Sequence, residues 1–225
     1  MKLFFRIFEK GGKIDLESIE LNNFLKLIDN LNSCNDIESN TIEFHKSKGL
    51  YTNEVIKENN IKFLKGIGHL RKLKTQFNNI NKLKYDIPKE FIGELRQYQY
   101  TGYCFLKTLS ELGFGGILGD EMGLGKTIQT IAFIASIKDK PSLIIAPSSL
   151  VLNLKQEFSK FAPELNIKLI TGYKEDRHKY LSNSNKYDVL ITTYSMFKND
   201  IEKYSNIDFN CVILDEAQNI KNPDS

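Results

Sequence analysis

The sequence predicts an α/β protein: a parallel sheet with helices on both faces, preceded by a small α+β region. From residue 91 onward, apolar segments of strand length alternate with helical segments, which is typical of chains that build a parallel sheet. Before that point, short strand and helix patterns follow one another less regularly. Asp86-Ile87-Pro88 separates the two parts, because a proline disfavours helix at the residue before it. We therefore expect an accessory region at 1–88 and a larger domain at 89–225.

The accessory region is predicted to combine short strands with helices. Lys10-Gly11-Gly12 predicts a hairpin turn, and apolar residues that recur every three or four positions over 21–31 predict a helix. The predicted strands are Phe4 to Phe8, Lys13 to Ile19 and Thr41 to His45, and residues 54–84 are predicted to be mostly helical with interruptions at Gly66 and Gly68.

A basic strip occupies the end of the accessory region. No acidic residue occurs between Glu58 and Asp86. One interpretation is a solvated helix face, and the other is a strip that contacts phosphate groups or a partner. The strip consists of Lys62, Lys65, Arg71, Lys72, Lys74, Lys82 and Lys84.

The larger domain is predicted to alternate strands and helices. In chain order we expect a helix over about 94–111, a strand through Ile117-Leu118, a helix from Lys126, a strand at Ser142–Ala146, a helix from Ser148 to Phe161, a strand at Ile167–Thr171, a polar helix, a strand at Asp188–Thr192, a helix from Tyr194 and a last strand at Cys211–Leu214.

Composition excludes several classes of protein. Hydrophobic residues make up 41 % and charged residues 26 % of the chain, which is a globular balance, and the net charge is only +3. Apolar runs reach about five residues, whereas a membrane-spanning helix needs about 18, so we expect no membrane association. Cys34, Cys104 and Cys211 lie far apart, and we expect them to be reduced thiols in a cytosolic protein.

The sharpest motif is Gly119-Asp120-Glu121-Met122-Gly123-Leu124-Gly125-Lys126-Thr127, between a predicted strand and a predicted helix. Glycines let the backbone curl so that N–H groups point inward, and the helix N-terminus adds partial positive charge. In such a loop Lys126 reaches the β- and γ-phosphates and Thr127 can hold Mg²⁺. The usual pattern has glycine where Asp120 stands, so a glycine-rich turn with an incidental Lys-Thr pair is the alternative.

A second motif, Val212-Ile213-Leu214-Asp215-Glu216, is a predicted strand that ends in two carboxylates. Asp215 follows Lys126 by 89 positions (215 − 126). At the tip of a strand, Asp215 is placed to bind Mg²⁺ through water, and Glu216 to orient and deprotonate an attacking water. An acid-rich helix N-terminus is the alternative. The two motifs in this order and spacing predict ATP binding.

These segments resemble the first ATPase lobe of the Swi/Snf-type DNA translocases, within superfamily two of the helicases, over about 91–225. In that family the phosphate loop begins with Asp-Glu-Met, so Asp120 fits. Four further segments resemble family motifs: Leu95-Arg96-Gln97-Tyr98-Gln99 with Gly102, Ala146-Pro147-Ser148-Ser149-Leu150-Val151, Ile191-Thr192-Thr193-Tyr194, and Asp215-Glu216-Ala217-Gln218 with Ile220-Lys221-Asn222.

The resemblance implies a RecA-like P-loop NTPase lobe that uses ATP and Mg²⁺ and has double-stranded DNA as its partner. It implies catalytic roles for Lys126, Asp215 and Glu216, and recognition of the adenine edge by Gln99. The implied nucleotide-binding residues are Arg96, Gln99, Asp120, Glu121, Met122, Gly123, Leu124, Gly125, Lys126 and Thr127; the implied metal ligands are Thr127 and Asp215; and the implied DNA-backbone contacts are Pro147, Ser148, Ser149, Thr192 and Thr193.

Departures from the family pattern refine this expectation. Phe105 and Leu154 replace family tryptophans. Ala217-Gln218 replaces the Gly-His of many eukaryotic remodellers, which favours a bacterial protein in the cytoplasm, at the nucleoid. Residues 1–88 more weakly resemble the tail of an accessory domain found in bacterial members.

Few residues follow Glu216, so the family's second lobe and its arginine finger have no counterpart here. The family strand that inserts between the phosphate-loop strand and the acidic-box strand also lacks a counterpart. We therefore expect an incomplete lobe, an N-terminal fragment of a longer protein, that has little ATPase activity alone.

The predicted function is that of an ATP-dependent double-stranded DNA translocase. One alternative is a strand-separating superfamily two helicase, which the Asp120-Glu121-Met122 spelling argues against. The other is an inactive nucleotide- or DNA-binding module, which the intact Lys126, Asp215 and Glu216 argue against for the full-length protein.

Overall fold

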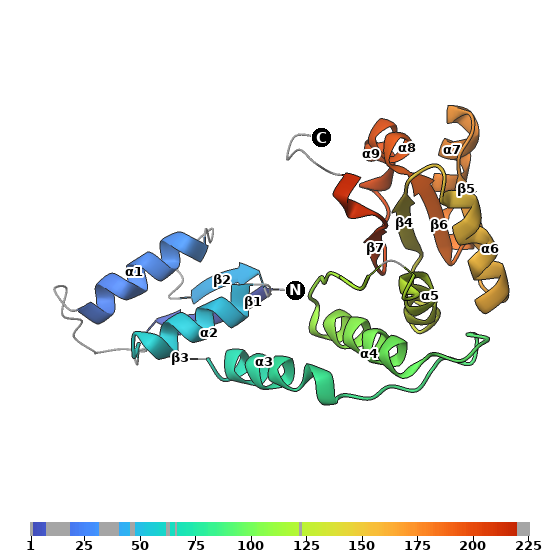
Figure 1. Cartoon of the computed structure of the whole chain (residues 1–225). Helices are drawn as coiled ribbons and strands as arrows, with labels where there is room; N and C mark the ends of the chain where they lie inside the picture. Colours follow the sequence, from blue (N-terminus) through green and yellow to red (C-terminus); the bar gives the residue numbers. More distant parts are fainter. Residues whose placement is uncertain are drawn as a thin grey trace. The chain divides into compact units, whose positions relative to one another are not determined.

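The computed structural model describes residues 2–7, 19–31, 41–45, 48–61, 64–65, 67–121 and 123–219. These residues form two compact units (Figure 1). The first comprises Met1–Lys84 and Cys104–Ile117, and the second comprises Tyr85–Tyr103 and Leu118–Ser225. The division therefore passes through a single helix, α4 (Gln97–Leu112).

The first unit contains a small antiparallel sheet and three helices. The strands lie in the order β2-β1-β3. Its elements are β1 (Lys2–Ile7), α1 (Ile19–Leu31), β2 (Thr41–His45), α2 (Gly49–Glu58), β3 (Leu64–Lys65), α3 (Gly68–Asn78) and the 3₁₀ turn η2 (Ile80–Lys82).

Apolar residues of α1, α2 and α3 form the core of this unit. Phe24 and Leu27, three positions apart, lie on the buried stripe of α1 that the helical spacing predicts. Residues 104–117 add a further contact, in which the ring of Phe114 meets that of Phe77 edge to face at a centroid distance of 6.0 Å. The buried members of the core cluster are Phe24, Leu27, Ile56, Ile61, Leu64 and Leu70.

The predicted helix at 21–31 and the strand at Thr41–His45 are confirmed. The prediction of helix through residues 64–65 is wrong, because β3 pairs with β1 there. A two-residue strand has no periodicity of its own, so only its partner reveals it. Ile19 begins α1 and is not a strand residue. The rest of the predicted hairpin, residues 8–18, lies outside the described residues.

The second unit is a parallel four-stranded sheet with helices, in the strand order β5-β6-β4-β7. Besides the first part of α4, its elements are α5 (Lys126–Ala135), β4 (Ser142–Ala146), α6 (Val151–Phe161), β5 (Ile167–Ile170), α7 (Lys174–Leu181), η3 (Ser184–Lys186), β6 (Val189–Thr193), α8 (Tyr194–Asn199), α9 (Ile201–Tyr204), β7 (Val212–Leu214) and η4 (Ala217–Asn219).

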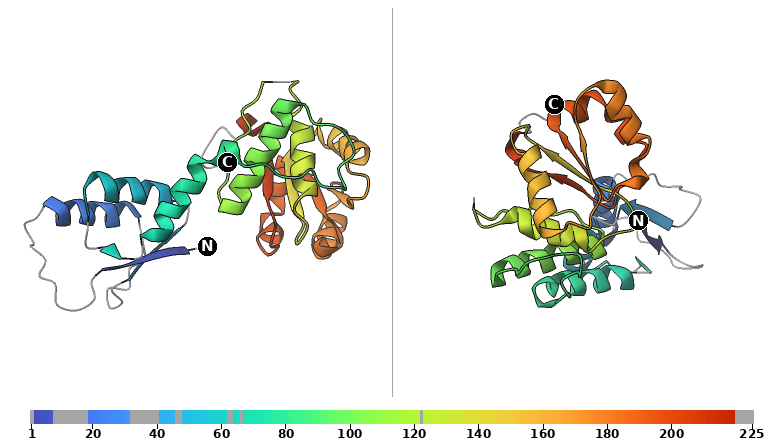
Figure 2. Two further views of the ribbon diagram at one scale, coloured as in Figure 1. Left: turned by 90° about the horizontal axis from the view of Figure 1, so that it is seen from below. Right: turned by 90° about the vertical axis from the view of Figure 1, so that its right-hand side faces the viewer.

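Helices cover both faces of this sheet, as predicted (Figure 2). The chain travels outward from β4 to β5 through α6, then returns to β6 and β7 through α7, α8 and α9. Right-handed crossovers place helices on opposite faces when the direction reverses. Helices α7, α8 and α9 therefore pack on the face that carries Leu143, Ile145 and Leu190, whereas α6 and its neighbour α5 cover the other face.

The strand predicted at Ile117-Leu118 is absent from the described structure, where residues 114–121 are irregular. The side chain of Ile117 is 88 % exposed, so no sheet neighbour covers it. A strand forms only where an adjacent strand pairs with its N–H and C=O groups. Within the described residues, β7 pairs only with β4, and Val212 and Leu214 remain about half exposed.

Candidate functional site

The predicted phosphate loop passes directly into helix α5. Gly123 and Gly125 adopt positive φ angles of 83° and 78°, and Gly125 is the N-cap of the helix. A Cβ atom on Gly125 would lie 2.5 Å from the side-chain nitrogen Nε2 of Gln99, so a larger residue would displace the Gln99 side chain as well as strain the positive φ. No side chain of the described residues caps this helix. Its first N–H groups are thus available for an anion.

Two side chains of α5 hold the loop. The Lys126 Nζ donates to the carbonyl oxygens of Asp120, at 2.8 Å, and Glu121, at 3.1 Å. An ammonium group has three donors, so one remains for a further acceptor. The Gln129 Nε2 donates to Asp120 Oδ2 at 2.9 Å. Asp120, where other phosphate loops carry glycine, is therefore tied to the helix that follows the loop.

Gln129 is a site residue that the sequence reasoning missed. It is completely buried, and its Oε1 has no hydrogen-bond partner among the described residues. A Cβ atom on Gly102 of α4 would lie only 1.8 Å from this oxygen. The signal in the sequence is a glutamine in the mostly apolar stretch Ile128 to Ala135, one position after Ile128.

Gln99 joins the start of α4 to the phosphate loop. Its Oε1 accepts the backbone N–H of Arg96 at 2.9 Å, which caps the helix, and its Nε2 donates to the Leu124 carbonyl at 3.1 Å. The side chain of Gln99 is buried, whereas Arg96 is exposed. Recognition of adenine by Gln99 stays a prediction, but the contact with the loop explains why a glutamine serves at this position.

The acidic pair lies at the carboxyl end of β7. The Asp215 N–H donates to the Ile145 carbonyl at 2.9 Å, which extends the ladder between β7 and β4. The Tyr194 hydroxyl donates to the Asp215 carbonyl at 2.8 Å. Glu216 has a φ of 51°, and Gln218 donates to its carboxylate. The left-handed backbone thus turns the chain sharply after the strand.

Electrostatics connect the two motifs. Burial raises the pKa of Asp215, and the neighbouring Glu216 carboxylate raises it further. Lys126 acts in the opposite direction, because its charge favours the ionised form of Asp215. The pKa of Tyr194 is also raised, first by burial and then by the charges of Asp215 and Glu216. The fold therefore brings the phosphate-loop lysine and the acidic pair, 89 positions apart, within electrostatic reach.

The other predicted nucleotide-site residues belong to the same loop. Thr127 occupies the first turn of α5 and is partly exposed. Leu124 contributes its carbonyl to Gln99. Met122 lies outside the described residues.

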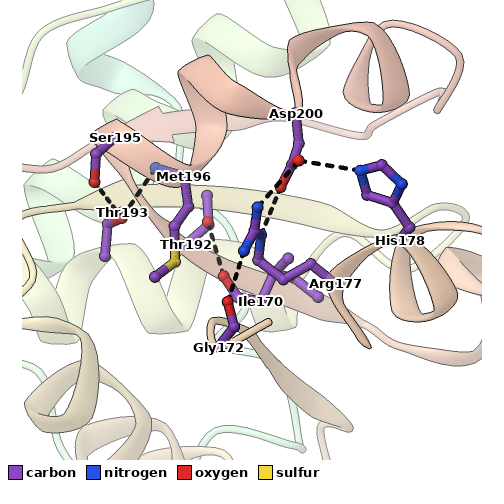
Figure 3. Close-up of polar contacts among 9 residues, drawn as sticks. All are labelled: Ile170, Gly172, Arg177, His178, Thr192, Thr193, Ser195, Met196 and Asp200. Atoms are coloured by element: carbon purple, nitrogen blue, oxygen red, sulfur yellow. Dashed lines mark hydrogen bonds and ion pairs between the residues drawn. The ribbon is translucent and has the colours of Figure 1, made fainter. Parts of the chain in front are cut away.

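The residues predicted to contact DNA occupy the carboxyl ends of β4 and β6, which are neighbours in the sheet. Ser148 and Ser149 are exposed, and Pro147 is partly exposed. Thr193 is buried and accepts a bond from the Met196 N–H, which caps α8 (Figure 3).

Thr192 serves the interior of the sheet. Its side chain is fully buried, and its hydroxyl donates to the Ile170 carbonyl at 3.0 Å. In this structure the Thr192 side chain is therefore enclosed, and its contact with the DNA backbone stays a prediction.

A buried ionic cluster lies beside these loops (Figure 3). Arg177 of α7 binds both carboxylate oxygens of Asp200, at 2.6 and 3.2 Å, and donates to the Gly172 carbonyl at 2.6 Å. His178 lies 3.1 Å from the same carboxylate. The pKa of Asp200 is lowered, mainly by its hydrogen bond with Arg177. The cluster joins the loop after β5 to the α8–α9 junction after β6.

Two family models match the chain. Residues 98–225 match the SNF2-related domain, and residues 2–88 match the bacterial SNF2 helicase associated domain. In the described part of the chain, no helix has the length and apolar character required to cross a membrane.

Relatives and solved structures agree with these matches. The putative ATP-dependent helicase/translocase YwqA of Bacillus subtilis is 40 % identical over 145 residues, which cover 62 % of this chain and 16 % of the relative. An ATP-dependent helicase of Mycoplasma pneumoniae is 38 % identical over 173 residues, or 73 % of this chain and 16 % of the relative. This chain thus spans about a sixth of the length of these relatives.

Among solved structures, the Sulfolobus solfataricus SWI2/SNF2 ATPase core in complex with double-stranded DNA is similar to this chain. The TM-score is 0.56 and the identity 37 %, over 63 % of this chain and 30 % of that one.

Proposed function

Because the chain belongs to the SNF2-related domain family, we propose that it provides the first ATPase lobe of an ATP-dependent translocase that acts on double-stranded DNA. The observation that carries this proposal is the meeting of two motifs, the loop that leads into α5 and the acidic pair after β7. Hydrolysis of a nucleoside triphosphate needs both motifs, because one set of groups binds the phosphates and the other acts at the γ-phosphoryl group.

The proposed roles follow from the positions of the side chains. The N–H groups at the start of α5 and the ammonium of Lys126 bind the phosphates. Glu216 orients a water molecule and accepts its proton. Asp120, held by Gln129, keeps the loop in place.

Mg²⁺ suits the donor set, because Thr127 offers a hydroxyl and Asp215 a carboxylate whose charge is disfavoured by burial and by Glu216. A bound Mg²⁺ would supply charge neutralisation at the phosphates. The oxygen atoms of Thr127 and Asp215 would hold it.

Double-stranded DNA is proposed as the partner, and the exposed Ser148 and Ser149 are proposed to contact its backbone. Support comes from the likeness to a SWI2/SNF2 ATPase core solved in complex with double-stranded DNA. A bacterial protein with this substrate would work in the cytoplasm, at the nucleoid. We also propose residues 1–88 as an accessory domain and 89–225 as the ATPase lobe, which the separate matches of the two family models support.

A substitution at Glu216 tests the proposed chemistry in the full-length protein. Glu216→Gln should leave ATP bound but lower DNA-stimulated turnover by at least about 100-fold, because an amide cannot accept the proton of the water. Phosphate release and calorimetric nucleotide binding are measured side by side. Glu157→Gln at a partly exposed position of α6, away from the phosphate loop, is the matched control. Normal turnover by Glu216→Gln would show that Glu216 is not the base.

A further inference from the structure

The first unit contains a groove between α2 and α3 with a volume of about 650 Å³. Each helix lines it with residues three and four positions apart, so each presents one continuous stripe. Lys57 and Asn60 line one side, and Arg71, Lys74 and Asn78 line the other. The groove therefore has two walls that carry cationic and amide groups.

The charge of the groove is positive. Lys57, Arg71 and Lys74 line it, and none of the described residues that line it is acidic. Glu54, outside the lining, pairs with Lys74, and this contact lowers the pKa of Glu54. Lys57 and Arg71 form no ion pair with a residue that the structure describes, and both are exposed.

The groove divides the basic strip into two groups. Arg71 and Lys74 face the groove, whereas their neighbour Lys72 is exposed and does not line it. Lys82 and Lys84 are exposed beyond α3, and the side chains of Lys62 and Lys65 lie outside the described residues. A solvated helix face does not by itself explain why Lys57 of α2 and Arg71 of α3 line the same groove, in which none of the described lining residues is acidic.

We propose that this groove binds the phosphodiester backbone of double-stranded DNA, an inference that rests on the proposed function. Lysine, arginine and asparagine side chains are donors to phosphate oxygens. None of the described lining residues is aromatic, so the groove offers no surface on which the bases of a single strand could stack. These features favour the backbone of a duplex.

The test measures the salt dependence of binding of the full-length protein to a short fluorescent DNA duplex. Arg71→Gln and Lys57→Gln should each weaken binding and reduce the slope of log K against log salt by about 0.9, because one phosphate contact is lost. Lys72→Gln is the matched control, since it removes the same charge from the same exposed helix outside the groove. It should keep the wild-type slope. ATP hydrolysis without DNA should be unchanged in all three variants, which shows that the ATPase unit is intact, and Lys72→Gln controls for effects of a substitution on the fold of the first unit.

The outcomes separate this inference from the proposed function. If the wild type binds duplex DNA and hydrolyses ATP but both groove variants keep the slope of Lys72→Gln, the inference alone is overturned. If the groove variants lose affinity for polyglutamate but not for DNA, the groove is a site for an acidic protein, and the inference is again overturned. A wild-type protein that binds no duplex DNA would overturn the proposed function itself.

Discussion

At the scale of single residues, the buried charge of Asp200, beneath the loops at the strand ends, has a strict requirement for a partner of opposite charge. The carboxylate of Asp200 is fully enclosed, and Arg177 supplies a bidentate partner. Enclosure of such a pair costs desolvation free energy, which good geometry offsets only while both partners are present. The pair is therefore intolerant of the loss of one charge.

We expect Asp200→Asn to lower the free energy of unfolding by about 3–5 kcal/mol at neutral pH, because it leaves the Arg177 charge buried without a counter-charge. Asp208→Asn is the control. It removes a carboxylate that pairs with Lys140 but is 79 % exposed, and it should cost less than about 1 kcal/mol. Denaturant unfolding measures both. Equal losses of unfolding free energy in the two variants would contradict the conclusion that Asp200 and Arg177 depend on each other as a buried ion pair.

The pH dependence of this pair has a definite sign. The pKa of Asp200 is lowered in the folded protein, so folding favours its ionised form. The stabilisation is therefore fully present above the ordinary aspartate pKa of about 3.9 and disappears as the pH falls through the lowered folded value. The difference in stability between wild type and Asp200→Asn should shrink over that acidic range.

At the scale of elements, α4 and α5 meet through a glycine. The Gln129 amide occupies the space where a side chain at position 102 would stand, and it also binds Asp120 of the phosphate loop. Helix packing and loop geometry are thus coupled through one side chain.

We expect Gly102→Ala to destabilise the protein by about 1–3 kcal/mol through overpacking, although alanine is the better helix former. The displaced Gln129 would release Asp120, so nucleotide affinity should fall as well. Adding Gln129→Ala to this variant should recover part of the loss from overpacking, because it clears the space. Gly68→Ala, where nothing lies within 4 Å of the new Cβ, is the control and should not destabilise. Independent, additive effects of the changes at 102 and 129 would refute the coupling.

At the scale of the whole molecule, binding of a nucleotide to the folded state should raise its stability. At a ligand concentration of 100 times Kd the gain is about 2.7 kcal/mol. For a chain of this size, that gain corresponds to a rise in Tm on the order of 5–11 °C. The phosphate loop must be intact for this gain to appear.

Lys126→Ala should therefore abolish the rise in Tm that a non-hydrolysable ATP analogue with Mg²⁺ produces in the wild type, because a charge-assisted phosphate contact is lost. Differential scanning fluorimetry measures the shift. Lys155→Ala, at an exposed position of α6, should keep the full shift. A full shift in Lys126→Ala would mean that this lysine does not bind the phosphates.

Features encoded by neighbouring residues could be predicted from the sequence. The strand at Ser142–Ala146 has its predicted bounds, because a run of apolar residues buried on both faces has a local signature. The start of α5 at Lys126 also follows from neighbouring residues, because Gly123, Gly125 and Lys126 determine the turn within four positions. The pairing of loop and acidic motif was inferred from their order along the chain.

Tertiary structure decided what depends on partners distant in sequence. The pairing of β3 with β1, the bond between Asp120 and Gln129 behind the loop, and the enclosure of Asp200 by Arg177 have no periodic or local pattern. Ile117-Leu118 shows what happens without a partner. This apolar pair has strand propensity but stays irregular, because no described neighbour pairs with it. Local pattern determines how a segment is disposed to fold, but hydrogen bonding across a sheet and charge pairing in a core require two segments to meet.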